Sequence, residues 1–291
     1  MPNELSVTTK RLLLVTLIIA AILFITFLPT LTTDMINKID TGLYNSIEKL
    51  KAEGTPESLA KAAGRSVAVW QIALQYLAWA NIIFIAGIAL LAILKPFYNG
   101  KTWAKGLVLL CLAVAAITGA YTIQAWFNIV VRANPDIGFP PSIVLMIVSL
   151  IPYFFVVLAT KKQAGQKIID FFVFLLTGVG SGTAFLVGVH AFKAVYSFPQ
   201  KPLLAADAPT LWLAMLLSSF LLLASIFQLG AGRNSGWYTA FVGSTTMLIA
   251  SAWTHFFVRQ PNNNYLFTAI GFAVFVVLLL LPQVKKHFVS D

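Results

Sequence analysis

Long apolar blocks separated by short polar stretches are the main pattern in this chain. Eight of these blocks are each long enough to cross about 30 Å of hydrocarbon as an α-helix. They cover roughly residues 12–32, 67–94, 106–131, 142–160, 168–194, 209–231, 236–257 and 264–284. The pattern therefore predicts an all-α, polytopic membrane protein with eight transmembrane helices.

The stretch 33–65, between the first two blocks, has a mixed pattern. Its leucines and isoleucine at 43–50 fall on one helical face. Further on, Thr55 is a typical N-cap, Pro56 suits the first helical position, and Gly64 suits a helix end. We expect two short amphipathic helices lying on the outer membrane face. They could dock a partner, but a simple cover over the mouth of the bundle is the favoured interpretation.

Two octets in the chain nearly repeat each other. AWFNIVVR (125–132) and AWTHFFVR (252–259) share Ala, Trp, Val and Arg at the same positions. They end the third and seventh apolar blocks. The seventh comes four predicted helices after the third, an even number, so the two halves would be parallel repeats. This predicts two four-helix bundles, 1–162 (with the outer loop 33–65) and 163–291. Convergence is the alternative, because Trp prefers the membrane interface and Arg stops a helix at the headgroups.

Composition supports the membrane assignment. The chain has 291 residues, of which 59% are hydrophobic and 10% are charged, with a mean hydropathy of +0.85. Soluble domains carry about 25% charged residues, so this chain cannot cover a water-facing surface. Its single cysteine, Cys111, lies in an apolar block, which excludes an internal disulfide.

The net charge of +10 does not indicate a nucleic-acid partner, because the basic residues occupy short loops between apolar blocks. If the N-terminus is cytoplasmic, eleven Lys and Arg residues fall on the inner side and four in the short outer loops. The bias predicts an N-in, C-in orientation. We expect an integral protein of a bacterial inner membrane whose partners are the lipid bilayer and other membrane subunits.

Charged residues are nearly absent from the apolar blocks. No Glu lies in any of them, and Asp170 lies just inside the fifth, where a pair with Lys167 is a sufficient account. Proton- and sodium-coupled transporters usually need intramembrane carboxylates, so a coupled pump is disfavoured. The same block holds small residues spaced four apart, which predict close approach of a neighbouring helix: Gly178 and Gly182, and Gly180, Ala184 and Gly188.

Two histidines are the sharpest candidate for chemistry. His190 ends the fifth block and His255 the seventh, both near the outer face, on helices that would be diagonal in a four-helix bundle. Such a pair could ligate one b-type haem, with Lys193 and Arg259 neutralising its propionates. The alternative, which we favour, is that both are interfacial residues with a polar tip near water. No catalytic motif and no other metal-binding motif is recognisable.

Three function classes fit these observations. The favoured one is a non-catalytic multi-pass subunit of a larger membrane complex, packing against partner helices and against lipid or hydrophobic cofactors. The second is a quinol-linked or b-haem electron-transfer subunit that uses His190 and His255. The third is a transporter or channel for a neutral or lipid-like substrate between the two halves.

Overall fold

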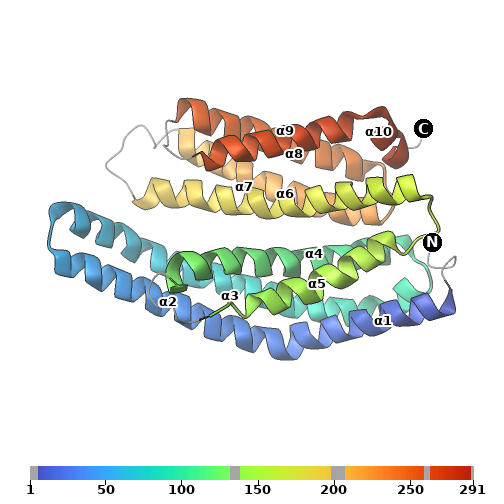
Figure 1. Ribbon diagram of the computed structural model, residues 1–291, viewed down its shortest axis with the longest axis horizontal. Coiled ribbons are helices and arrows are strands. Elements are labelled where there is room, and N and C mark those ends of the chain that lie inside the picture. Colours follow the sequence, from blue (N-terminus) through green and yellow to red (C-terminus); the bar gives the residue numbers. More distant parts are fainter. Residues whose placement is uncertain (1–5, 132–137, 198–206, 259–262, 290–291) are drawn as a thin grey trace.

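The computed structural model describes residues 6–131, 138–197, 207–258 and 263–289, and these residues are almost entirely helical. The helices run lengthwise in a long bundle, with the two chain ends at one end of it (Figure 1). In chain order the elements are α1 (Val7–Ile22), a π-helical turn (Leu23–Phe27), α2 (Leu28–Glu53), α3 (Pro56–Tyr98), α4 (Thr102–Ala125), a second π-helical turn (Trp126–Val131), α5 (Ser142–Leu158), α6 (Ala164–Ser197), α7 (Asp207–Gly230), α8 (Ser235–Phe257), α9 (Asn264–Leu280) and α10 (Pro282–Phe288).

A long helical hairpin replaces the two short surface helices predicted for residues 33–65. The π-helical turn Leu23–Phe27 joins α1 to α2, and α2 then packs antiparallel on α3. The Thr55 side chain does cap α3, accepting from the backbone N–H of Ser58 at 3.1 Å. However, the predicted end at Gly64 was wrong, because α3 continues through it to Tyr98.

This α2–α3 hairpin projects past the other helices (Figure 1) because α3 has 43 residues, about 64 Å, against about 30 Å of hydrocarbon. The apolar stripe that the sequence placed on a membrane surface instead faces the partner helix: Leu43 and Ile47 are buried, as is Ala62 on α3. The tip turns at Gly54, whose φ of 65° suits glycine.

Five helical segments are long and apolar enough to cross a membrane: Val7–Thr26, Gln75–Tyr98, Thr102–Val131, Ala164–Val189 and Thr210–Gly230. The pair α9 and α10, bent by 71°, gives a sixth if it counts as one broken span. Helix α5 is shorter, at 17 residues. The chain therefore fits an integral, multi-pass membrane protein, while eight complete spans are not confirmed.

Helix α4 is the centre of the bundle, buried along most of its length and in contact with α3, α5, α6 and α7. It meets α7 backbone to backbone, since a Cβ on Gly106 would lie 2.3 Å from the carbonyl oxygen of Phe227. Next to it, α6 and α7 are joined by serines. The Ser181 hydroxyl donates to the Ser219 carbonyl at 3.0 Å, and the Ser219 hydroxyl returns a bond to the Ser181 carbonyl at 2.9 Å.

The two similar octets lie in different environments. Trp126 is 1% exposed, begins a π-helical turn, and donates from its indole nitrogen to the Gly138 carbonyl at 3.1 Å. Trp253 is 47% exposed, and α8 stays α-helical around it. The duplication into 1–162 and 163–291 stays a prediction.

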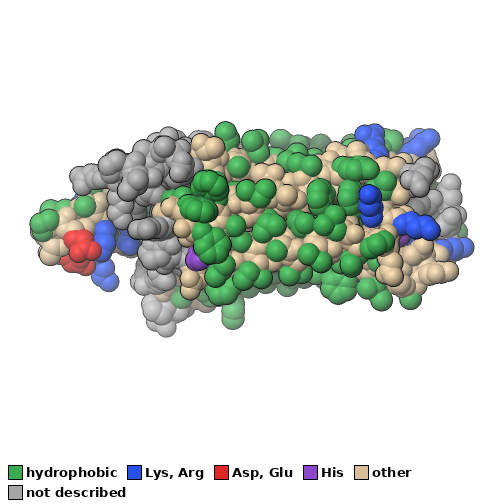
Figure 2. Space-filling model, turned by 90° about the horizontal axis from the view of Figure 1, so that it is seen from above, with side chains coloured by type: hydrophobic (Ala, Val, Ile, Leu, Met, Phe, Trp, Pro, Cys, Tyr) green, Lys and Arg blue, Asp and Glu red, His purple; other side chains and the backbone are tan. Residues whose placement is uncertain are grey.

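The surface divides into an apolar belt and a basic end. Exposed hydrophobic side chains cover the middle of the molecule, and Lys and Arg gather at the end where the chain termini lie, here called the terminal end (Figure 2). The opposite end, from which the hairpin projects, is called the hairpin end. This segregation matches the sequence-based division of basic residues between short loops.

Candidate functional site

The predicted histidine site is only partly described. His255 lies near the end of α8 and is partly exposed, and its ring meets Phe256 edge-on at 4.9 Å between centroids. Its Nδ1 is buried and has no hydrogen-bond partner, and the same holds for the hydroxyl of Ser251 one turn earlier. His190 and Lys193 belong to α6, but their side chains lie outside the described residues, as does all of Arg259.

The haem prediction therefore rests on His255 alone within the described residues. A haem-ligating histidine usually donates its second ring N–H to a carbonyl or carboxylate, which fixes the ring. No described group accepts from Nδ1 of His255. Among the described residues there is also no cluster of three His, Cys, Asp or Glu side chains that could hold a metal ion. The paired-histidine site stays a prediction.

An apolar crevice lies among α4, α5 and α6. It has a volume of about 430 Å³ and is lined by residues 113–124 of α4, 146–154 of α5 and 174–186 of α6. Pockets that hold small ligands have volumes of about 300–1,000 Å³. No charged side chain lines the crevice. It lies inside the apolar part of the bundle, so its natural contents are hydrophobic.

Glycines on α6 create part of this space. An added Cβ at Gly178 would meet no atom within 4 Å, and one at Gly182 would meet only Ile117, at 3.5 Å. The predicted close approach of a neighbouring helix is therefore not found at Gly178, which faces the crevice. It is confirmed at Gly180, against the Phe272 ring, and at Gly188, against the backbone and side chains of α7.

The two ends of the crevice differ. At the terminal end the lining is aromatic: Tyr153 meets Phe154 edge-on at 5.1 Å, and its hydroxyl donates to the Phe174 carbonyl at 3.1 Å. Toward the hairpin end the lining includes Gln124 and Thr183. Polar groups at one end and rings at the other give the crevice a direction.

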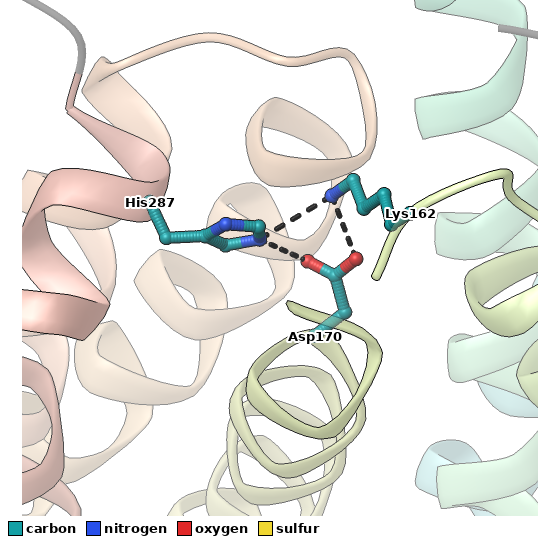
Figure 3. Close-up of polar contacts among 3 residues, drawn as sticks. All are labelled: Lys162, Asp170 and His287. Carbon is teal, nitrogen blue, oxygen red and sulfur yellow. Dashed lines mark hydrogen bonds and ion pairs between the residues drawn. The ribbon is translucent and has the colours of Figure 1, made fainter. Parts of the chain in front are cut away.

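A buried polar cluster at the terminal end is the second notable site (Figure 3). The Lys162 ammonium lies 2.7 Å from Oδ2 of Asp170, and Nε2 of His287 lies 2.8 Å from Oδ1. The Asp170 side chain is 4% exposed. The predicted pairing of Asp170 with Lys167 was wrong: Lys162 comes from the α5–α6 connection and His287 from α10. Each carboxylate oxygen of Asp170 therefore has a partner, and the cluster links α6 to the α5–α6 connection and to α10.

Sequence reasoning missed the crevice and the role of His287. The small residues of α4 and α6 were a visible signal, but small residues also mark tight helix packing, so the pattern could not separate the two. His287 is far from Asp170 in sequence, and no local spacing links them. Comparisons with protein-family models, with curated proteins and with solved structures give no match to this chain.

Proposed function

We propose that this chain is a non-catalytic, multi-pass subunit of a larger membrane protein complex, which packs against partner helices and against lipid or another hydrophobic molecule. The observation that carries the proposal is the α2–α3 hairpin. Spanning a bilayer does not require two helices that extend well beyond the hydrocarbon.

The hairpin is built as a firm, water-facing element. Where it meets the bundle, its inner face shares a small hydrophobic core with Trp126, and farther out Ile47 and Ala62 are buried between its two helices. Its outer face carries ion pairs along each helix, such as Lys38 with Asp34 at 2.7 Å. A rigid element of this kind can dock a partner without first being ordered, which lowers the entropy cost of binding.

The described polar groups do not form a catalytic arrangement. Catalysis needs a positioned acid, base or nucleophile that can reach a substrate. Within the described residues, the buried carboxylate of Asp170 is held by two partners, and the crevice is lined without charge. This supports a binding and packing role.

Site-specific photo-crosslinking in native membranes tests the proposal. A photoreactive phenylalanine at Tyr44, which is 55% exposed on the hairpin, or at Leu59, 46% exposed, should give one discrete protein adduct. Dilution into detergent before illumination is the control, because chance collisions then disappear and a stable complex persists. Absence of any adduct at both positions, with the chain migrating alone on a native gel, would contradict the proposal.

A second candidate function is transport of a neutral or lipid-like substrate between the two predicted halves. The observation that favours it is the place of the crevice, between α4 and α5 on one side and α6 on the other. Reconstituted vesicles that contain a fluorescent phospholipid test this. Chemical bleaching of the lipid in the outer leaflet should remove about half of the fluorescence in protein-free vesicles. It should remove nearly all of the fluorescence if the chain moves lipid between the leaflets.

The electron-transfer alternative, a quinol-linked or b-haem subunit using His190 and His255, has a separate test. Reduced-minus-oxidised absorbance bands in the purified protein would support it, and their loss in His255→Ala would assign the ligand. A featureless spectrum would remove it. Nδ1 of His255 has no partner among the described residues, whereas a haem ligand is usually oriented by such a partner, and this favours the featureless spectrum.

A further inference from the structure

We infer that the crevice between α4, α5 and α6 binds one acyl chain of a membrane phospholipid, with the lipid headgroup at the hairpin end. The inference rests on the proposed function, because both require the chain to sit in a bilayer and to contact lipid. It goes further by naming the site, the ligand and the direction in which the ligand lies.

The first argument is access from the membrane. The crevice walls belong to Thr102–Val131 and Ala164–Val189, two of the five segments able to cross a bilayer. Val179, in its α6 wall, is 57% exposed. A cavity open to hydrocarbon and lined by apolar side chains fills with hydrocarbon, since an empty space would forfeit dispersion contacts on every wall.

Length gives the second argument. On α6 the lining runs from Phe174 to Leu186, about 18 Å of helix. Half of a hydrocarbon core of about 30 Å is about 15 Å, which is the depth that one leaflet's acyl chain spans. The crevice therefore matches one chain of one leaflet, and the rings of Tyr153 and Phe154 stop it near the bilayer centre.

Direction is the third argument. Gln124 and Thr183 contribute a carboxamide and a hydroxyl toward the hairpin end, and neither makes a hydrogen bond to another described residue. The nearby Tyr121 hydroxyl is already committed, donating to Gln75 at 3.1 Å. Unpaired donors at this depth suit the ester carbonyls of a phospholipid. The terminal end of the crevice offers no such group, since the Tyr153 hydroxyl is bonded to the backbone.

Two glycines with open space above them provide a matched test. Gly178 faces the crevice and Gly271 lies on the exposed surface of α9, and a Cβ at either would meet no atom within 4 Å. The Cβ of Gly178→Leu therefore enters open space and its side chain extends into the crevice, while Gly271→Leu makes the same chemical change outside it. Gly178→Ala is a milder filling variant that also favours the helix.

The experiment uses the full chain in nanodiscs made with a phosphatidylcholine that carries a diazirine at the end of one acyl chain. After illumination, peptide mapping should place the label on residues of α5 and α6 around Phe154 and Phe174. Labelling there should fall about tenfold in Gly178→Leu and less in Gly178→Ala, with no change in Gly271→Leu. Equal melting temperatures confirm that the variants are folded.

Three results would overturn the inference. Labelling spread evenly over all lipid-facing helices, or unchanged in both Gly178 variants, would mean that the crevice holds no chain. A quinone or other prenyl lipid recovered from the wild type and lost in Gly178→Leu would replace the phospholipid with another occupant. The hairpin cross-links from Tyr44 report the proposed complex independently, since Gly178 lies in the bundle and not on the hairpin.

Discussion

The imidazole Nε2 of His287 lies 2.8 Å from Oδ1 of Asp170, although 117 residues separate the two in the chain. The contact ties α10, at the end of the chain, to the start of α6 (Figure 3). Helix α10 has seven residues and cannot hold its own conformation in water. Its position therefore depends on contacts with the bundle, which include this one, the burial of Val284 and the packing of Phe288.

Removing His287 should release α10. In His287→Ala the Asp170 carboxylate keeps Lys162 and loses its second partner, and a hydrogen bond to a charged group contributes about 1.5–3 kcal/mol. We expect amide hydrogen exchange in residues 282–288 to accelerate by at least about tenfold. Mass spectrometry of peptic peptides from detergent-purified protein measures this. Lys167→Ala is the control and should change nothing; an equal effect would mean that Lys167 holds Asp170 in solution.

A methyl group at Gly106 should disrupt the centre of the bundle. Its Cβ would lie 2.3 Å from the Phe227 carbonyl oxygen, so α4 and α7 must move apart. Overpacking of this kind typically costs about 1–3 kcal/mol. Gly106→Ala should lower the melting temperature in detergent by about 5 °C. Gly165→Ala, where a Cβ meets nothing within 4 Å, should not, and equal melting of both variants would refute the close approach.

Loss of the helix cap at the tip of the hairpin should loosen the start of α3. Thr55→Ala removes the acceptor for the Ser58 N–H, which costs about 1 kcal/mol. Exchange of the first-turn amides of α3 should become about fivefold faster. Thr41→Ala is the control, because that hydroxyl bonds only to the Asn37 carbonyl within the same helix. If both variants exchange alike, the cap does not form.

The Glu57–Lys61 ion pair makes a small, pH-dependent contribution to the stability of the first turns of α3. The hydrogen bond and charge of Lys61, 2.7 Å away, lower the pKa of Glu57 from its ordinary 4.5. A lowered pKa in the folded state means that the pair stabilises α3 above the unfolded pKa, and that this is lost as pH falls through the folded value. A carboxyl-carbon NMR titration should find the Glu57 pKa returned to its ordinary value in Lys61→Ala.

Orientation in the membrane is open to direct labelling. Because eleven basic residues gather at the terminal end, we expect that end in the cytoplasm and the hairpin outside. Glu53→Cys should react with an impermeant maleimide in intact cells, and Ala164→Cys only after lysis. The native Cys111 is buried and should give no background. The reverse pattern would place the hairpin in the cytoplasm.

The membrane character and the helical class could be predicted because they follow from local composition. Each of the eight apolar blocks is largely helical, since a backbone in lipid has no other way to satisfy its N–H and C=O groups within one segment. The cap at Thr55 was equally local. Length and hydropathy alone could not predict which blocks are complete spans, as the short α5 and the bent α9–α10 pair illustrate.

Other features depend on contacts distant in sequence. Leu43 and Ile47 had to be buried somewhere, but periodicity alone could not say whether against headgroups or against α3. The spacing of Gly178 and Gly182 is the same for a tight helix contact and for a cavity wall. The octets share residues, yet Trp126 is buried by α2, and the part of the chain that the structure describes has no counterpart of α2 beside Trp253.

Because α3 is one unbroken helix, a change in the tilt of its membrane segment moves the tip of the hairpin. From the middle of its membrane segment to Pro56 the helix extends about 45 Å, so a tilt of about 10° carries the tip about 8 Å sideways. Helices change tilt when bilayer thickness changes. Because α2 is joined to α1 through the π-helical turn Leu23–Phe27, the tip follows two membrane segments together. The position of a partner bound at the tip would therefore depend on the thickness of the membrane.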